Sequence, residues 1–447
     1  MNRQARALTP PKGWNSWDCY GTTVTEDEVL ANARFMAEHM AQVGWDTVVV
    51  DIQWYEPTAR AGGYNANPPV ELDAYGRPLP APLRFPSSAG GQGFGPLAAQ
   101  VHALGLRFGV HVMRGIPRRA VDLDLPVHGT AFTAREIADT TSVCPWNPDN
   151  YGLDHTHPGA QAYYDAQVAQ LAAWGVDFLK VDDMLAPYHA ADIEALARAI
   201  ARAETEIRSG EPMILSLSPG TNLSTANVEH LRANAQMWRI SDDLWDRWDD
   251  VEAQLTRLAR WAPLQRAGGW ADADMLPLGR IGIRAERGAD RPSRLTREEQ
   301  RTLLTLWCLA RSPLMMGGDL PTTDPETIAM LVHPALHELL DASADAGELW
   351  REGDLVVWGA RGTGPANDGA RYAGVFNTGD APLDVALHAR SAALEHRALT
   401  DVWTGEPVRA RPGSDAAGDQ TEIPLTVPPH GVRLLRGDVS SPRKEKS

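Results

Sequence analysis

The sequence predicts an α/β protein, a (β/α)8 TIM barrel followed by a small antiparallel β-sandwich domain. Two patterns predict this fold class. Short apolar runs alternate with stretches of helical period between about residues 13 and 316, and short alternating segments broken by turn residues fill the chain after about residue 345. The length of 447 residues also suits a large barrel with a modest second unit.

Eight apolar runs are the expected barrel strands. They lie at residues 14–18, 46–51, 106–113, 176–183, 213–218, 236–241, 268–275 and 312–318. Amphipathic stretches between them predict helices, at residues 26–43, 159–174, 190–208 and 297–310. Strands that alternate with helices indicate parallel βαβ units, and eight such units in about 300 residues favour a closed barrel over an open sheet.

The expected domain boundaries follow from this change of pattern. We expect a catalytic barrel over residues 1–340, an antiparallel β domain over 345–437 and a polar tail over 438–447. Residues 55–95 are rich in Pro, Gly and Ala, and they predict a long loop on the active-site face of the barrel.

Charge and composition exclude several classes of partner. With 42 basic and 58 acidic residues the formal net charge is −16, which disfavours binding to nucleic acid or to an anionic membrane surface. No apolar run approaches the length of a membrane span, and the N-terminal segment has no apolar signal core. The three cysteines match neither a disulfide framework nor a zinc motif. We therefore expect a soluble cytoplasmic protein.

Tryptophan is the unusual feature of the composition. The chain has 15 Trp against 7 Phe and 9 Tyr. Large buried aromatics are normal in a core, whereas exposed flat rings could stack on the C–H face of a sugar. Composition alone favours core packing over a sugar site.

Polar side chains end most of the expected strands. In a (β/α)8 barrel these carboxyl ends form the active-site face. A single acidic residue at a strand end could simply cap the following helix, but several acidic residues at the same end of the barrel predict an active site. The residues are Asp51, Gln53, His111, Asp182, Asp183, Ser216, Ser218, Ser241, Asp242, Asp243, Asp272 and Asp274.

The carboxylates suit glycoside hydrolysis, which uses two acids that flank the glycosidic bond. Asp182 follows an apolar run and has Lys180 on the same side of the strand, so that a nearby ammonium keeps the carboxylate ionised as a nucleophile requires. The second acid is either Asp242 or Asp243, just past the strand that carries Arg239. Spacing alone does not separate these two.

Other classes fit less well. Acidic strand ends could hold Mg²⁺, but Lys180 would stand beside the cation, and there is no H-E-x-x-H motif. The chain has neither a G-x-S-x-G elbow nor a glycine-rich phosphate loop after a strand. We expect neither metal nor cofactor. A non-catalytic sugar-binding protein stays open, and mutation of Asp182 separates it from an enzyme, which would lose turnover and keep affinity.

A series of motifs resembles glycoside hydrolase family 27, which contains the α-galactosidases, in order and spacing over nearly the whole chain. They are GWNSWDCYG (13–21), VDIQW (50–54), RFP (84–86), LGLRFGVH (104–111), DFLKVDD (177–183), WRISDD (238–243), GGWADADML (268–276), LWCLARSPLMMGGDL (306–320), WTGE (403–406) and PPHGV (428–432).

The resemblance implies a retaining double-displacement mechanism with Asp182 as nucleophile. It places the acid/base at Asp243, four residues after the strand arginine. Retention requires the two carboxyl groups to lie roughly 5–5.5 Å apart. The resemblance also implies substrate contacts from Trp17, Asp51, Lys180, Arg239 and Asp274.

One departure from the family bears on the substrate. α-Galactosidases carry paired acids at the end of the second strand, and here the pair is Asp51 and Ile52. Ile cannot accept a hydrogen bond from the hydroxymethyl group of galactose, and such a loss costs about 1–3 kcal/mol. β-L-Arabinopyranose has the configuration of α-D-galactose without that group. The strings VDIQWYEP and HVMRGIPR also look like the β-L-arabinopyranosidases of the family. The alternative is an α-galactosidase in which Ile52 is neutral.

Three further departures concern His111, Ser218 and Met184. His111 replaces the Tyr of many relatives, and Ser218 replaces a Glu or Cys near the sugar 2-hydroxyl, so that both are candidate substrate contacts. Met184 replaces the cysteine of the family's disulfide beside the nucleophile, which leaves Cys144 free and agrees with a reducing compartment. The expected partner is a small glycoside or oligosaccharide, and since the family commonly self-associates, a homo-oligomer also stays open.

Overall fold

Eight short strands pair in parallel to form one sheet that curls on itself. The strand order is β10-β9-β8-β7-β3-β2-β1-β13. A parallel bridge joins Leu276, just past β10, to Met316 of β13, so that the sheet closes into a barrel. The strands are β1 (Lys12–Asn15), β2 (Thr47–Val50), β3 (Arg107–Met113), β7 (Phe178–Asp182), β8 (Ile214–Leu217), β9 (Met237–Arg239), β10 (Trp270–Asp272) and β13 (Leu314–Met316).

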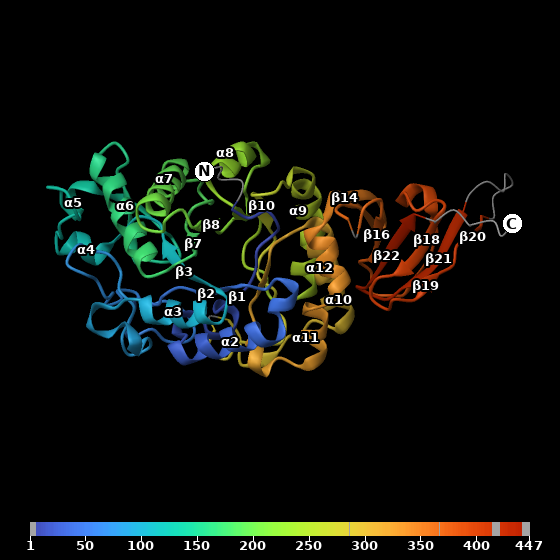
Figure 1. Ribbon diagram of the computed structural model, residues 1–447, viewed down its shortest axis with the longest axis horizontal. Coiled ribbons are helices and arrows are strands. Elements are labelled where there is room, and N and C mark those ends of the chain that lie inside the picture. The colour runs from blue at the N-terminus through green and yellow to red at the C-terminus, as the bar shows by residue number, and fades with distance from the viewer. Residues whose placement is uncertain (1–5, 286, 366, 414–420, 440–447) are drawn as a thin grey trace. The chain divides into compact units, whose positions relative to one another are not determined.

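The computed structural model describes residues 6–439 except 286, 366 and 414–420. The chain divides into two compact units (Figure 1). The first unit comprises Met1–Leu244, Arg266–Ser293 and Pro313–Pro325, and it contains every barrel strand. The second comprises Trp245–Gln265, Arg294–Ser312 and Glu326–Ser447.

The barrel strands are buried on both faces, which explains why each reads as an apolar run. The side chains of Val48, Val49 and Val50 in β2 are all fully buried. Seven of the eight predicted runs contain a barrel strand and the run over 14–18 overlaps β1, so that the barrel part of the predicted fold class is confirmed. Helices of the first unit that follow these strands in the chain are α2 (Glu26–His39), α3 (Gly95–Ala103), α6 (Pro158–Ala173), α7 (Ala190–Glu206) and α8 (Val228–Asn234).

A small antiparallel sheet inserted after β3 was not predicted. It consists of β4 (Ile116–Pro117), β6 (Asn150–Leu153) and β5 (Ala138–Val143), in that order. Strand β5 has the sequence ADTTSV and no buried residue, so that it shows no apolar alternation by which to recognise it.

Among its described residues, the second unit contains two antiparallel sheets and four α-helices, of which α11 begins at the last residue of the first unit. The larger sheet has the order β14-β15-β16-β22-β18-β19, and the smaller has the order β17-β21-β20. The strands are β14 (Ser343–Glu352), β15 (Leu355–Gly362), β16 (Arg371–Asn377), β17 (Leu383–His388), β18 (Arg397–Asp401), β19 (Pro407–Val408), β20 (Arg411–Pro412), β21 (Thr421–Val427) and β22 (Val432–Val439). The helices are α9 (Trp248–Trp261), α10 (Arg297–Ala310), α11 (Pro325–Leu331) and α12 (Pro334–Asp341).

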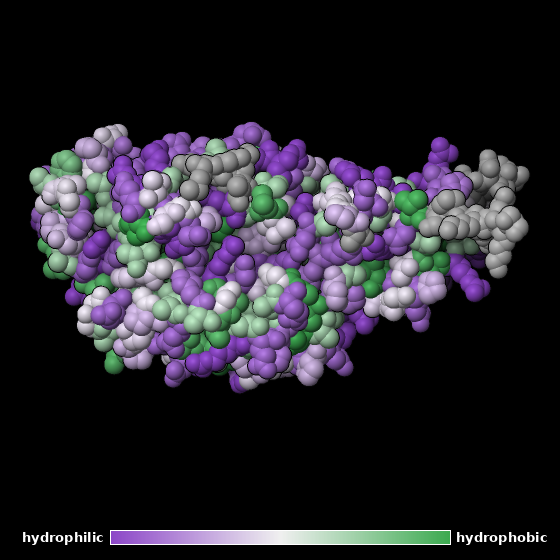
Figure 2. All heavy atoms as spheres, in the orientation of Figure 1, coloured by the Kyte–Doolittle hydropathy of each residue, from purple (hydrophilic) through white to green (hydrophobic). Residues whose placement is uncertain are grey.

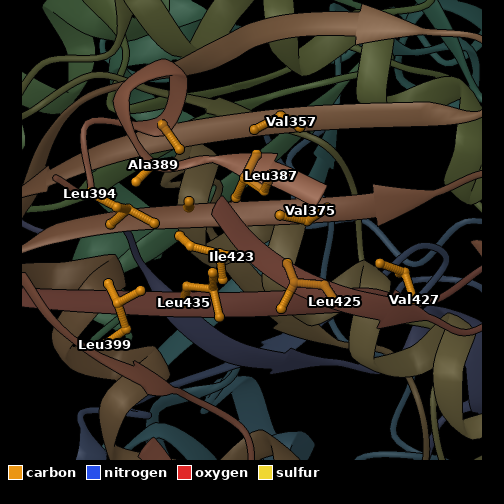
Figure 3. Packing of buried hydrophobic residues seen from close by; sticks show 12 residues of the cluster. Val357, Val375, Leu387, Ala389, Leu394, Leu399, Ile423, Leu425, Val427 and Leu435 are labelled. Carbon is orange, nitrogen blue, oxygen red and sulfur yellow. The ribbon is translucent and has the colours of Figure 1, made fainter. Parts of the chain in front are cut away.

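A shared apolar core packs the two sheets of the second unit together (Figure 3). Val357, Val375 and Leu435 face into it from the larger sheet, and Leu387 and Ile423 face into it from the smaller one. All five are essentially inaccessible to solvent. This sandwich confirms the second part of the predicted fold class. Residues 440–447, most of the predicted polar tail, lie outside the described residues.

The face of the protein shown in Figure 2 is mostly polar. Hydrophilic residues are spread over the face shown in Figure 2, and hydrophobic residues interrupt them only in small groups. Across the described part of the chain, no helix combines the length and the apolar character needed to span a bilayer.

Candidate active site

A cavity of about 360 Å³ opens at the carboxyl ends of the barrel strands. Seven of the ten site residues predicted from the sequence line it. They are Trp17, Asp51, Ile52, Lys180, Asp182, Arg239 and Asp243. The other three predicted residues do not line the cavity but are buried and bonded to residues that do. They are His111, Ser218 and Asp274.

Asp182 is held on both of its carboxylate oxygens. His111 Nε2 lies 2.8 Å from Oδ2, and the Ser218 hydroxyl donates a hydrogen bond to Oδ1. His111 has no solvent-exposed surface, and Asp182 is only 8 % exposed. The two neighbouring strands β3 and β7 are in register with His111 opposite Lys180, which brings both side chains beside the same carboxylate.

The surroundings keep Asp182 ionised. Burial alone opposes ionisation, but the positive charge of Lys180 and the contact with His111 outweigh it and lower the pKa of Asp182 from 3.8 to about 2. Lys180 Nζ lies 3.9 Å from Asp182 Oδ2. Lys180 thus lies on the same side of the strand as Asp182.

Lys180 also pairs with Asp51. Its ammonium lies 2.7 Å from Asp51 Oδ2, and the Asn15 amide donates to the same oxygen at 2.7 Å. Asp51, His111 and Asp182 each have an atom that could coordinate a metal ion, and these three atoms lie within 4.8 Å of one another. The Lys180 ammonium already supplies positive charge beside two of these three groups, so that a cation there would meet electrostatic repulsion.

Arg239 forms ion pairs with both Asp243 and the buried Asp274. Its guanidinium lies 3.3 Å from Asp243 Oδ1 and 2.7 Å from Asp274 Oδ1. Asp274 Oδ2 accepts a hydrogen bond from the Leu244 amide at 2.6 Å, which fixes the backbone next to Asp243. Burial raises the pKa of Asp274, and the charge of Arg239 opposes that rise. The Asp243 side chain is 34 % exposed, in contrast to the enclosed Asp182.

Neither Asp242 nor Asp243 caps the next helix, the alternative that the sequence left open. Helix α9 begins at Trp248 and its N-cap is Arg247. Asp242 lines the cavity as well, and its Oδ1 accepts a hydrogen bond from the Asp243 amide at 3.1 Å.

Sequence reasoning missed several cavity residues that come from loops. Tyr64 lies in the loop over residues 55–95, for which we expected a place on this face, and Trp146 lies between β5 and β6. The rings of Trp17 and Tyr64 are nearly parallel with centroids 6.0 Å apart, and those of Tyr64 and Trp146 are 5.9 Å apart. The remaining such residues are Ala186, Pro219, Thr221 and Arg287.

The cysteines form no disulfide. Cys19, Cys144 and Cys308 are all free and buried. Met184, which stands where the resemblance would require a cysteine, is itself fully buried. The expectation that Cys144 is free is confirmed.

Comparison with protein families gives two matches. Residues 150–338 match the family model described as alpha galactosidase A, and residues 352–436 match the alpha galactosidase C-terminal beta sandwich domain. Among curated proteins, the chain is similar to a probable alpha-galactosidase of Dictyostelium discoideum, with 24 % identity over 96 % of this chain and 92 % of that protein.

Solved structures show a higher likeness. A family 27 β-L-arabinopyranosidase from Geobacillus stearothermophilus, in complex with arabinose, is 42 % identical with a TM-score of 0.92, over 99 % of this chain and all of that one. A candidate α-N-acetylgalactosaminidase from Bacillus halodurans C-125 is 41 % identical with a TM-score of 0.84, over 97 % and 98 % of the two chains.

Proposed function

Because this chain belongs to glycoside hydrolase family 27 and is a glycosidase, we propose that it is a retaining exo-glycosidase that releases terminal β-L-arabinopyranose. The reaction has two displacement steps with a covalent glycosyl-enzyme between them. Asp182 and Asp243 are the two carboxyl groups that carry it. Two sets of observations support these roles.

Asp182 is the nucleophile in this proposal. A nucleophile must be ionised and fixed, and the low pKa of Asp182, together with the hydrogen bonds from His111 and Ser218, supports both properties. His111 and Ser218 thus position Asp182 and do not contact the sugar themselves. In the first step an Asp182 oxygen attacks the anomeric carbon, and the bond to the leaving-group oxygen breaks.

Asp243 is the acid/base. It protonates the departing oxygen in the first step and takes a proton from water in the second. A group with this role must reach both the leaving group and water, and the larger exposure of Asp243 at the cavity supports the assignment. Trp17, Asp51, Lys180 and Arg239 bind the sugar from the cavity walls, and Asp274 holds Arg239 in place.

The observation that carries the choice of sugar is Ile52. It lines the cavity beside Asp51, and its side chain is buried there. A hydroxymethyl group at this wall would be desolvated without a hydrogen-bond acceptor from Ile52, whereas arabinopyranose presents only a ring methylene. The likeness to an arabinopyranosidase over the whole chain also supports this substrate.

Substitution of Ile52 tests the proposal. The wild-type protein should prefer 4-nitrophenyl β-L-arabinopyranoside over the α-D-galactopyranoside, measured side by side as kcat/KM. We expect Ile52→Asp to shift this ratio toward the galactoside by about tenfold or more, because one buried hydrogen bond is regained. Ile52→Leu is the matched apolar control and should keep the arabinoside preference.

A wild-type preference for the galactoside would overturn the sugar assignment and favour the α-galactosidase that the curated relatives suggest, and an unchanged ratio in Ile52→Asp would show that Ile52 does not determine the preference. The same assay separates catalysis from mere binding. Asp182→Asn should lose turnover of both glycosides while it still binds free arabinose in calorimetry.

A further inference from the structure

The cavity extends outward from the catalytic residues along a strip of aromatic rings. The strip is formed by Trp17, Tyr64 and Trp146, all of which line the same cavity as Asp182. Exposure increases along it, since Trp17 is 5 % exposed and Trp146 is 37 % exposed. The strip therefore continues from the enclosed part of the cavity to its rim.

The outer part of the strip is built from two different loops. Tyr64 comes from the long connection that follows β2, and Trp146 comes from the insertion that follows β3. A buried carboxylate fastens the two loops to each other. Asp149 Oδ2 accepts hydrogen bonds from Gln53 Nε2 at 2.7 Å and from the Tyr55 hydroxyl at 2.6 Å.

Further hydrogen bonds fix the segment on either side of Tyr64. The Gly62 amide donates to the carbonyl of Ala285 at 3.2 Å, and the Asn65 amide group donates to the buried Glu56 carboxylate at 2.6 Å. On the side of Trp146, the Asp149 amide donates to the side chain of the fully buried Asn147 at 2.9 Å. These bonds fix the segments on which the two rings stand.

We propose that Tyr64 and Trp146 bind the leaving group of the substrate, and that this leaving group is a pyranose ring, so that the enzyme cleaves oligosaccharides with the next sugar stacked on these two side chains. The proposal rests on the exo-glycosidase function above and adds the class of aglycone. A pyranose offers an apolar C–H face of the size of an aromatic ring, and an exposed aromatic ring beside a polar cavity is a suitable partner for it.

The cavity is also lined by polar side chains, which agrees with this ligand. It carries Asp242, Thr221 and Arg287, whose oxygen and nitrogen atoms suit the hydroxyl groups on the edge of a sugar. Asp243, the proposed acid, lies beside Asp242 and is exposed to the same cavity. A sugar ring stacked on Tyr64 and Trp146 would therefore lie in the same cavity as that acid.

Two types of substrate with the same sugar test the proposal. β-L-Arabinopyranosyl fluoride has a single atom as leaving group, whereas a disaccharide with a terminal β-L-arabinopyranosyl residue has a pyranose there. We expect Trp146→Ala and Tyr64→Ala to lower kcat/KM for the disaccharide roughly 3- to 10-fold, the value of one lost ring contact. Trp146→Ala should leave the fluoride within about twofold of wild type, whereas Tyr64 also stacks on Trp17 and is used with the disaccharide alone.

Tyr75→Ala is the matched control, because Tyr75 is an exposed aromatic residue of the same long loop that is absent from the cavity lining, and it should change neither substrate. Trp146→Phe should retain most of the disaccharide activity. Equal losses on both substrates in Trp146→Ala would overturn the aglycone site. If the wild type hydrolyses α-D-galactopyranosyl fluoride but not the arabinosyl fluoride, the sugar assignment fails instead, and the aglycone site is then tested with the galactosyl pair.

Discussion

At the scale of single residues, the two carboxyl groups that we propose as catalytic lie in opposite environments. Asp182 is enclosed, contacts His111 and Ser218, and lies near the ammonium of Lys180. Asp243 has one neighbouring arginine and is open to the cavity. Such a difference suits a nucleophile that stays ionised and an acid that exchanges protons with its surroundings.

The acidic limb of the pH–activity profile should depend on His111. Asp182 has a pKa of about 2, below its ordinary value of 3.8, and burial opposes this shift while Lys180 and His111 cause it. The ionised form is active, so that protonation of Asp182 reduces activity only at very low pH in the wild type. His111→Leu removes a donor and should raise that pKa, so that kcat/KM begins to fall at a higher pH. The kcat/KM profile between pH 3 and 8 measures the change.

His111→Gln keeps an N–H donor and should lie closer to the wild type. The same linkage affects stability, since a carboxyl group with a lowered pKa in the folded state stabilises the fold above pH 4 and loses that contribution as the pH falls toward 2. His111→Leu should therefore lose less stability between pH 5 and 3 than the wild type does. Superimposable activity profiles for wild type and His111→Leu would contradict this account.

At the scale of elements, the barrel places residues that are far apart in sequence around one cavity. Asp51 follows the last residue of β2, Asp182 ends β7 and Arg239 ends β9. The sequence could predict these positions because a buried parallel strand is an apolar run, and a polar residue at its end stands out. Tyr64 and Trp146 could not be predicted in the same way. They belong to irregular segments, which have no periodicity to fix which side chain turns inward.

Helix α10 begins with a reciprocal cap that should be measurable by itself. The Thr296 amide donates to Glu299 Oε2 at 2.7 Å, and the Glu299 amide donates to the Thr296 hydroxyl at 3.3 Å. Thr296→Ala leaves an amide of the first turn without its partner, and we expect a loss of about 1 kcal/mol in the free energy of unfolding. Denaturant titration measures it, and Thr296→Ser, which keeps the hydroxyl, should stay near the wild type. Equal stability of the Ala and Ser variants would show that the cap contributes nothing.

At the scale of the whole molecule, the catalytic cavity and the sandwich core belong to different compact units. Every residue that lines the cavity lies in the first unit, whereas the core around Leu435 lies in the second. The second unit also takes in α9 and α10, two helices that alternate with barrel strands along the chain. The helical period of the sequence identifies such helices but does not reveal the unit with which they pack. A helix that packs on the barrel and a helix that packs on the second unit both need one apolar face, so that their patterns are the same.

Truncation of Leu435 should therefore affect stability and leave catalysis intact. Leu435 is fully buried among Val357, Val375 and Ile423 (Figure 3). Leu435→Ala removes three carbon atoms from a closed core, and such changes cost about 2–5 kcal/mol through lost burial and the remaining cavity. We expect faster hydrogen exchange in β15, β16 and β22, a lower melting temperature, and an unchanged kcat at temperatures well below melting.

Leu349→Ala is the matched control, because Leu349 lies in the same sheet but is 46 % exposed, and its truncation should change stability by less than about 0.5 kcal/mol. A fall in kcat for Leu435→Ala at low temperature, with the fold intact by circular dichroism, would contradict the separation and show that the sandwich core influences the catalytic cavity.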